Sequence, residues 1–275
     1  MSKEKETKNV NQLWHSAIPE NMHLALNISQ SNNLHLDTSD FTKAYTYLAD
    51  MHVLKQGLTD VMDMLAAFGN CPALLLMGEL PVPDFSFEKV APFFEQLTEI
   101  SLSTSMLKEY PTWIHHFQQI HTLRIRRTGI SSIPTDLLPL PNLVYLSMEN
   151  NDKLDTLPDC FDLFPKLQYL NLQDSPIQRL PDSFYTCSDI IKLDINRTPL
   201  ISLSPLVEQL QELQALDCTS TALTSLPIQL SKLPKLSYLK ITDTPLLANA
   251  AAFDDSEMGI IGGHRNVVKF IKQVI

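Results

Sequence analysis

Residues 167–181 read LQYLNLQDSPIQRLP, and a matching stretch, IIKLDINRTPLISLS, follows at residues 190–204. Both stretches place apolar residues at positions 1, 4, 6, 11 and 14 and a short polar residue at position 9. The same frame recurs at intervals of 23 or 24 residues, beginning at Leu97, Ile120, Leu143, Leu167, Ile190, Leu213 and Leu236. This repeat predicts a solenoid, because each turn of chain can bury its apolar side only by stacking on the next turn.

Each unit is expected to form a short strand and then a tight helical turn. The alternating apolar residues near its start, such as Leu170 and Leu172, are typical of a strand with one side in the core. After the proline that ends the straight run, apolar residues recur at every third position, which favours a 3₁₀ segment. The ninth position predicts a buried polar ladder that bonds to backbone groups, formed by Ser105, Thr128, Asn151, Ser175, Thr198, Thr221 and Thr244.

At these positions the chain resembles the leucine-rich repeat family in its 23-residue form. The resemblance covers residues 97–246, which are 150 of the 275 residues. It implies an α/β solenoid: a curved horseshoe with a concave parallel β-sheet, a convex side of 3₁₀ and short helices, and an α-helical N-terminal cap. The compact repeats are similar to leucine-rich repeat domains of bacterial effectors secreted by type III or type IV routes.

Outside the repeats, the sequence predicts capping segments, because a solenoid otherwise exposes its stacked core at both ends. We expect helices at residues 12–18, 38–54 and 60–68, and a strand at residues 34–36. At the C-terminal end we expect a short helix from residue 247, a mobile loop at residues 254–264 and a closing helix at residues 266–274. The expected organisation is a disordered tail (1–10), a helical cap (11–70), a degenerate first repeat (71–96), seven repeats (97–246) and a C-terminal cap (247–275).

Composition excludes several classes of protein. The net charge of −10 argues against a general nucleic-acid binder, which needs a surplus of Lys and Arg. No apolar run is long enough to span a membrane, and the N-terminal sequence MSKEKETKNV lacks the apolar core of a secretory signal. The four cysteines are widely spaced, which favours reduced thiols. We therefore expect a cytoplasmic protein, or one secreted into a host cell by a Sec-independent route.

The sequence shows no convincing catalytic or metal-binding constellation. His115, His116 and His121 are close together, but they flank apolar positions and no further ligand has matching spacing. Residues 259–264, GIIGGH, lack the lysine of a phosphate-binding loop. Cys187 and Cys218 occupy core positions, where small buried thiols are the simpler interpretation. We expect no enzymatic activity, no catalytic residues, no metal and no cofactor.

The outward side chains of the strands are the informative surface, because the core does not need them. Arg124, Arg126 and Arg127 are predicted to place three guanidinium groups on one strand, and Tyr145 and Tyr169 occupy equivalent positions in the next two units. Arg and Tyr are enriched at binding hot spots. The alternative is that Arg124 and Arg126 form solvated ion pairs with Glu99 and Glu149 on adjacent strands. The predicted contact residues are Arg124, Arg126, Arg127, Tyr145, Glu149, Tyr169, Asn171, Lys192, Asp194, Arg197, Tyr238 and Lys240.

The sequence thus favours a monomeric, non-enzymatic module that binds a partner protein on its concave face, such as an effector that acts on a host protein. Two alternatives stay open: the substrate-recognition part of an enzyme such as a ubiquitin-ligase effector, and a scaffolding protein inside a bacterial cell. About 29 residues follow Leu246, which are too few for a ligase domain. The segment at residues 81–94, with Phe85, Phe87, Phe93 and Phe94, would be a second docking site if a pair of these rings were exposed.

Overall fold

The computed structural model describes residues 2–14, 16, 19–77, 83–249 and 259–274. The chain divides into two compact units, which we call the helical unit and the repeat unit. The helical unit comprises residues 1–75 and 81–98, and the repeat unit comprises residues 76–80 and 99–275. This division places residues 81–98 with the helices, whereas the sequence predicted the end of the cap at residue 70.

The helical unit is built around an aromatic cluster. Phe41 lies 4.9 Å from Phe68 and 4.7 Å from Phe93, and Trp14 lies 5.3 Å from Phe93, measured between ring centroids. All four rings are buried, so one small core joins elements that are far apart in the sequence. These elements are α1 (Lys3–Trp14), α2 (Pro19–Asn32), α3 (Ser39–Asp50), α4 (Val61–Gly69), α5 (Phe87–Val90) and the 3₁₀ helix η1 (Ala91–Phe93).

Two predictions for this unit were wrong, one helix was not foreseen, and one predicted helix is described only in part. Residues 3–10, expected to be disordered, form most of α1, because Val10 and Trp14 are one turn apart and both are buried. Helix α2 was not foreseen, and the expected strand at residues 34–36 is an extended connection without strand pairing. Of the helix expected at residues 12–18, residues 12–14 lie in α1, and residues 15, 17 and 18 lie outside the described part of the chain.

The segment at residues 81–94 is not an exposed docking loop in its described part, residues 83–94. Phe85 packs on Phe87 with ring centroids 4.9 Å apart, and Phe94 contacts Phe68 at 4.8 Å. All four phenylalanines of the segment are buried, with at most 9% of their surface exposed. They stabilise the helical unit, so the proposed second docking site through an exposed pair is excluded. Residues 81 and 82 lie outside the description.

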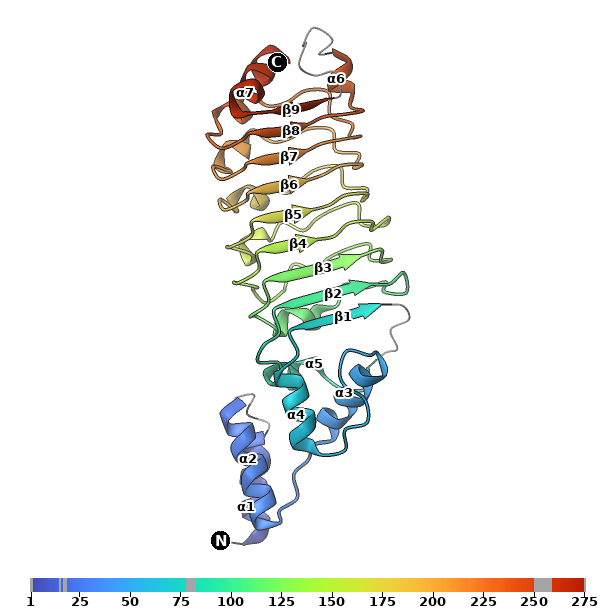
Figure 1. Cartoon of the computed structure of the whole chain (residues 1–275), viewed down its shortest axis with the longest axis vertical. Helices are drawn as coiled ribbons and strands as arrows, with labels where there is room; N and C mark the ends of the chain where they lie inside the picture. The colour runs from blue at the N-terminus through green and yellow to red at the C-terminus, as the bar shows by residue number, and fades with distance from the viewer. Residues whose placement is uncertain (1, 15, 17–18, 78–82, 250–258, 275) are drawn as a thin grey trace. The chain divides into compact units, whose positions relative to one another are not determined.

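Nine strands among the described residues form one sheet, in chain order from β1 to β9. Strands β2 to β8 pair in parallel and in register, so that equivalent positions of successive repeats are neighbours (Figure 1). The fold is therefore a leucine-rich repeat solenoid, as the sequence predicted. The strands are β1 (Ala73–Met77), β2 (Glu99–Ser103), β3 (Thr122–Arg126), β4 (Tyr145–Ser147), β5 (Tyr169–Asn171), β6 (Lys192–Asp194), β7 (Ala215–Asp217), β8 (Tyr238–Lys240) and β9 (Ile260–Gly262).

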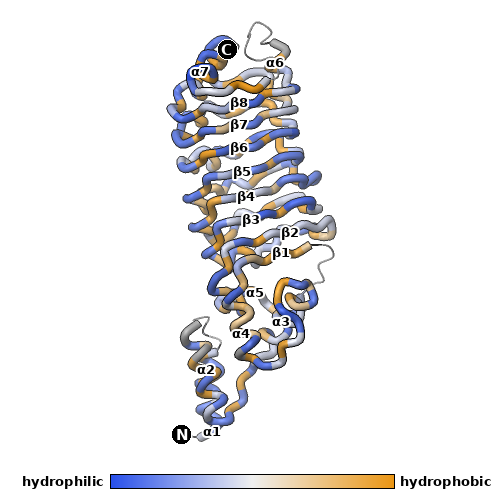
Figure 2. Tube along the Cα trace, in the orientation of Figure 1, coloured by the Kyte–Doolittle hydropathy of each residue, from blue (hydrophilic) through white to orange (hydrophobic). Residues whose placement is uncertain are grey.

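Short 3₁₀ helices return the chain between the strands of most repeats, although residues 127–144, between β3 and β4, contain none. The apolar residues of strand and helix fill the space between them. Hydrophobic and hydrophilic residues alternate along the chain within each turn of the repeat unit (Figure 2). Residues at every third position, such as Phe184, Cys187 and Ile190, are buried as predicted. The helices are η2 (Thr112–His116), η3 (Phe161–Leu163), η4 (Asp182–Thr186), η5 (Pro205–Gln209) and η6 (Ile228–Lys232).

The polar ladder at the ninth position is confirmed in six of the seven units. Asn151 is its most connected member: its amide donates to the carbonyl oxygens of Ile125 and Met148, at 2.8 and 2.9 Å, and its side-chain oxygen accepts from Thr128. Thr198, Thr221 and Thr244 instead donate to the carbonyl three residues earlier. Ser105 is the exception, because it is exposed. The ladder holds the turns in register.

The C-terminal end closes the repeat unit with an unexpected strand. Residues 259–264 were predicted to belong to a mobile loop, but Ile260–Gly262 form β9, which pairs antiparallel with β8. Ile261 is buried, and the amide of Ile241 donates to the carbonyl of Gly259 at 2.7 Å. Residues 254–258 of the predicted loop lie outside the description. The flanking helices are α6 (Pro245–Asn249) and α7 (His264–Val274), where the sequence predicted a short and a closing helix.

Candidate partner-binding face

The outward side chains of β2 to β8 form a surface that we call the strand face. Strand pairing arranges them in rows, because each residue lies beside its counterpart in the next repeat. The first row is Glu99, Thr122, Tyr145, Tyr169, Lys192, Ala215 and Tyr238. The second row is Ser101, Arg124, Ser147, Asn171, Asp194, Asp217 and Lys240.

Arg124 and two tyrosines form a stacked group near the start of this face. The Arg124 guanidinium pairs with Glu99 and lies over the Tyr145 ring, with its central carbon 4.9 Å from the ring centroid. The Tyr145 and Tyr169 rings are 6.2 Å apart, as their register predicts. The Arg124 and Glu99 side chains keep 29% and 33% of their surface exposed. An aromatic and cationic surface is thus held in place and accessible.

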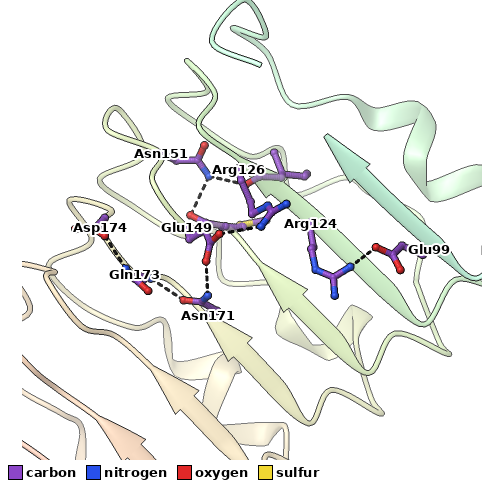
Figure 3. A network of polar contacts seen from close by, with 10 residues as sticks. Glu99, Arg124, Arg126, Glu149, Asn151, Asn171, Gln173 and Asp174 are labelled. Carbon is purple, nitrogen blue, oxygen red and sulfur yellow. Dashed lines mark hydrogen bonds and ion pairs between the residues drawn. The ribbon is translucent and has the colours of Figure 1, made fainter. Parts of the chain in front are cut away.

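A second polar network lies beside it (Figure 3). Arg126 pairs with Glu149 on the neighbouring repeat at 3.1 Å, and the Asn171 amide donates to the other Glu149 oxygen at 2.7 Å. Beneath this network, Arg126 Nε and Ser147 Oγ are buried and have no hydrogen-bond partner among the described residues. Buried polar atoms normally find a partner, so the network has hydrogen-bonding capacity that these neighbours do not use.

The structure confirms the ion pairs that the sequence suggested as the alternative. Arg124 pairs with Glu99, and Arg126 pairs with Glu149. Such half-exposed pairs contribute only about 0–1 kcal/mol to folding. They do, however, fix the direction of two long side chains. A pre-oriented arginine loses less side-chain entropy when a partner binds, so pairing and recognition are compatible.

Arg127 does not share the strand with the other two arginines, which corrects the prediction. Strand β3 ends at Arg126, and Arg127 has a left-handed backbone with φ of 52° and an exposed side chain. The same left-handed conformation recurs at the equivalent position of the following repeats, at Asn150, Asp174, Arg197, Ser220 and Asp243. These residues therefore form a separate row along the turns that leave the strands.

Hydrogen bonds between residues two apart in the sequence support three of the turns that carry this left-handed residue. The side-chain oxygens of Asn171, Asp194 and Asp217 each accept from the backbone amide two residues later, at 3.0, 3.3 and 2.9 Å. This local bond bends the chain just before the left-handed residue. In the turn row, Arg197 pairs with Asp174 of the preceding repeat at 3.3 Å.

The later part of the strand face carries two aspartates and two lysines. Asp194 and Asp217 lie side by side in register, and each pairs loosely with a lysine: Asp194 with Lys192 at 3.8 Å, and Asp217 with Lys240 at 3.7 Å. Tyr238 is exposed at the end of the row. Lys192 lies beside Tyr169 and Asp194 beside Asn171, so this part continues the rows of the earlier part. Glu99, Asp174 and Asp217 join the predicted residues as ion-pair partners. The sequence signal for these partners is the 23-residue spacing, which places each of them near a basic residue of the next repeat.

The histidine cluster has a structural explanation. His115 is buried; its Nδ1–H must donate to the Leu138 carbonyl, so its Nε2 accepts from the Tyr110 hydroxyl at 2.8 Å. Burial lowers the pKa of His115 and raises that of Tyr110. His121, by contrast, is exposed. Within the described ranges, no three His, Cys, Asp or Glu side chains are grouped to hold a metal ion.

The cysteines are free and buried, in agreement with their interpretation as small apolar side chains. Burial raises the pKa of Cys187 to about 12 and that of Cys218 well above its ordinary value. Both thiols therefore stay protonated, which is unfavourable for a nucleophile. For the part of the chain that the structure describes, no helix has the length and apolar character needed to cross a membrane.

Comparison with known proteins agrees with this architecture. Residues 118–177 match the leucine-rich repeat family. A segment of 81 residues is 36% identical to a "Probable disease resistance protein" of Arabidopsis thaliana, and this match covers 29% of the chain and 10% of the plant protein. The chain therefore spans only a small part of that relative.

Two solved structures extend the similarity. A leucine-rich repeat protein of Leptospira interrogans aligns with a TM-score of 0.59 and 24% identity, covering 74% of this chain and 52% of that one. The leucine-rich repeat domain of the type III effector XopL aligns with a TM-score of 0.53 and 19% identity, covering 77% and 87%. At these identities the likeness establishes the fold alone. The stacked turns that present the strand face therefore have the leucine-rich repeat fold.

Proposed function

We propose that the repeat unit is a non-enzymatic module that binds a partner protein on the strand face. The observation that carries this proposal is the Arg124–Tyr145–Tyr169 group, a guanidinium and two aromatic rings held together on three successive strands. These residue types dominate the energetics of protein interfaces. The fold favours such a role, because a stack of repeats presents an extended surface that the core does not need.

The support beneath this surface strengthens the proposal. The side chains that alternate with the strand face, such as Leu123, Leu146 and Leu170, are buried, and the Asn151 ladder fixes the turns. A rigid scaffold lowers the ordering cost of binding. We assign the main contacts to residues of the strand face and the turn row: Arg124, Arg126, Arg127, Tyr145, Glu149, Tyr169, Asn171, Lys192, Asp194, Arg197, Tyr238 and Lys240.

A narrower version of the proposal is that the chain acts as an effector on a host protein. Its support is the similarity to the repeat domain of the type III effector XopL, together with the resemblance of its compact repeats to secreted bacterial repeats. A reporter enzyme fused to the chain would test this version. Its appearance inside co-cultured host cells, dependent on an intact secretion system, is the expected result; retention in the bacterium would favour the scaffolding alternative.

The binding proposal is tested by affinity capture with a double variant, Arg124→Gln/Arg126→Gln. Because the two ion pairs contribute little to folding, the variant should fold normally and lose partner capture at least tenfold. A matched control, Lys232→Gln/Lys235→Gln, removes two ion-paired cations away from the strand face. Equal loss in both variants, or no loss in the arginine variant, would contradict the assignment of the contact to the strand face.

A further inference from the structure

Two polar atoms of the strand face are buried without a hydrogen-bond partner among the described residues. They are Arg126 Nε and Ser147 Oγ. Ser147 is 1% exposed and lies beside Arg124 in register, and Arg126 is the next residue after Arg124 on the same side of β3. A guanidinium N–H can only donate a hydrogen bond, and a hydroxyl can donate one. The two atoms are therefore complementary to a group with acceptor oxygens.

The ion pairs of the two arginines leave donors unused. Arg124 donates to Glu99 and Arg126 donates to Glu149, in both cases through Nη1. A guanidinium has five N–H donors in a fork geometry, and a carboxylate fits such a fork with both of its oxygens. Arg126 can therefore keep Glu149 at Nη1 and donate to a second carboxylate through the edge that contains Nε.

The network around Arg126 permits the movement that such a contact needs. Nε is covered in the free protein, so a ligand reaches it only after a rotation of the guanidinium plane. The Arg126 side chain is 36% exposed, which leaves room on its solvent side. Glu149 does not depend on Arg126 alone, because the Asn171 amide donates to its other oxygen at 2.7 Å (Figure 3). The rotation therefore leaves Glu149 with a hydrogen-bond donor.

The local charge favours an anion. Arg124 and Arg126 are balanced by Glu99 and Glu149, but Arg127 follows them as a third cation. Its side chain is exposed, and no acidic side chain of the described residues forms an ion pair with it. One incoming carboxylate would balance this charge and form charge-assisted hydrogen bonds. An ammonium group would be repelled, and a neutral amide would form only the weaker uncharged bonds.

We propose that these residues are the receptor for an acidic side chain, Asp or Glu, of the partner protein. The inference rests on the proposed binding at the strand face and names the chemistry of that contact. The carboxylate would accept from Arg126 Nε and Ser147 Oγ, with Arg127 as the nearby cation. An apolar residue next to it in the partner would lie against the Tyr145 and Tyr169 rings, which are on the neighbouring strands.

The test is a titration of the intact chain, in which the Nε–Hε resonance of Arg126 is followed by NMR and identified by its loss in Arg126→Lys. Acetyl-Phe-Asp-amide should shift this resonance to saturation. Acetyl-Phe-Asn-amide, which has the same shape without the charge, should leave it unchanged at equal concentration. No saturable shift with the Asp peptide, or an equal shift with the Asn peptide, overturns the proposal. Tighter binding of acetyl-Phe-Gly, which has a free terminal carboxylate, overturns the assignment to a side chain.

Two variants test the roles of the hydroxyl and of the third cation. Ser147→Ala should weaken binding of the Asp peptide by about fivefold. It should leave the melting temperature unchanged, because the hydroxyl has no partner in the free protein. Arg127→Gln should weaken binding by about threefold, and the control Arg179→Gln, at an exposed position outside the strand face, should change nothing. Undiminished binding in the Ser147 variant would show that the buried atoms hold an ordered water only, which contradicts the proposal.

The result is separate from that of partner capture. If capture depends on Arg124 and Arg126 but the Asp peptide does not bind, the strand face still recognises a protein and the acidic side chain is excluded. If the peptide binds but capture survives substitution of both arginines, the carboxylate site stands and the proposed function fails.

Discussion

The helical unit and the repeat unit bury apolar side chains in opposite ways. In the repeat unit, a residue's position within a 23-residue frame decides whether it is buried, so Leu123, Leu146 and Leu170 are equivalent. In the helical unit, Trp14, Phe41 and other rings meet across long sequence distances, and each contact is made once. The first design leaves a whole face free for binding, whereas the second uses its rings in one irregular core.

The largest expected effect comes from deleting one ring in each core. Phe41→Ala should destabilise the helical unit by about 3–5 kcal/mol, because the ring is buried and contacts three others. Phe184→Ala is the matched change in the repeat unit. Denaturant unfolding followed by Trp14 and by Trp113 fluorescence should show each variant lowering the transition of its own unit. If either variant shifted both transitions equally, the two cores would not be independent.

The polar ladder gives the next largest effect. Asn151→Ala should cost about 2–4 kcal/mol, because it removes the buried hydrogen bonds to the Ile125 carbonyl and to Thr128, and one of the two that the Met148 carbonyl accepts. Ser105→Ala, at the equivalent position of an earlier repeat, should be nearly neutral because that serine is exposed. Equal losses in the two variants, measured by denaturant unfolding, would show that repeat position alone decides the cost.

A smaller effect is expected at the C-terminal end, where the periodic frame stops. Gly259 has φ of 66°, and an added Cβ would lie 2.8 Å from the Thr242 backbone, so Gly259→Ala should cost about 1–3 kcal/mol. A Cβ at Gly262 would meet nothing within 4 Å, and Gly262→Ala is the control. Hydrogen exchange of the Ile241 amide, which donates to Gly259, should rise in the first variant only. Unchanged protection there would contradict the role of β9 as a closing strand.

The smallest expected effect is a pH dependence. Burial lowers the pKa of His115 below its ordinary value of 6.5, so below pH 6.5 the unfolded chain binds more protons than the folded one. Stability should therefore fall as the pH falls through 6.5 towards the pKa of the folded state. His115→Gln should flatten this decline, and His121→Gln, at an exposed position, should not. A decline of the same slope in all three proteins, from thermal melts between pH 8 and 5, would assign it to other groups.

Sequence predicted the repeat unit well because its rule is periodic. The positions of the strands, the buried residues at every third position of the helical turns and the polar ladder all follow from the 23-residue repeat. The ion pairs of Glu99 and Glu149 follow from the register of neighbouring strands. The left-handed backbone at Arg127 and Arg197 could not be foreseen, because glycine is the residue that usually marks this conformation. Strand β9 was missed because it has three residues, two of which are isoleucines beside glycines.

The helical unit was predicted less well, because its contacts are not periodic. Helix α2 carried a signal that was overlooked: Met22, Ala25, Leu26 and Ser29 lie at helical spacing and are all buried. The polar composition of the first ten residues predicted disorder. Residues 3–10 are helical because Val10, like Trp14 one turn later in α1, is buried.

The central claim, that the strand face recognises a protein, is tested most directly by site-specific photo-crosslinking. A benzophenone amino acid would replace Lys192 or Tyr238, both exposed on the strand face, or Gln209, exposed on η5. Partner protein should crosslink from positions 192 and 238 and not from 209, and an excess of unlabelled chain should compete. Crosslinking from position 209 alone would contradict the account and assign recognition to the side opposite the strands.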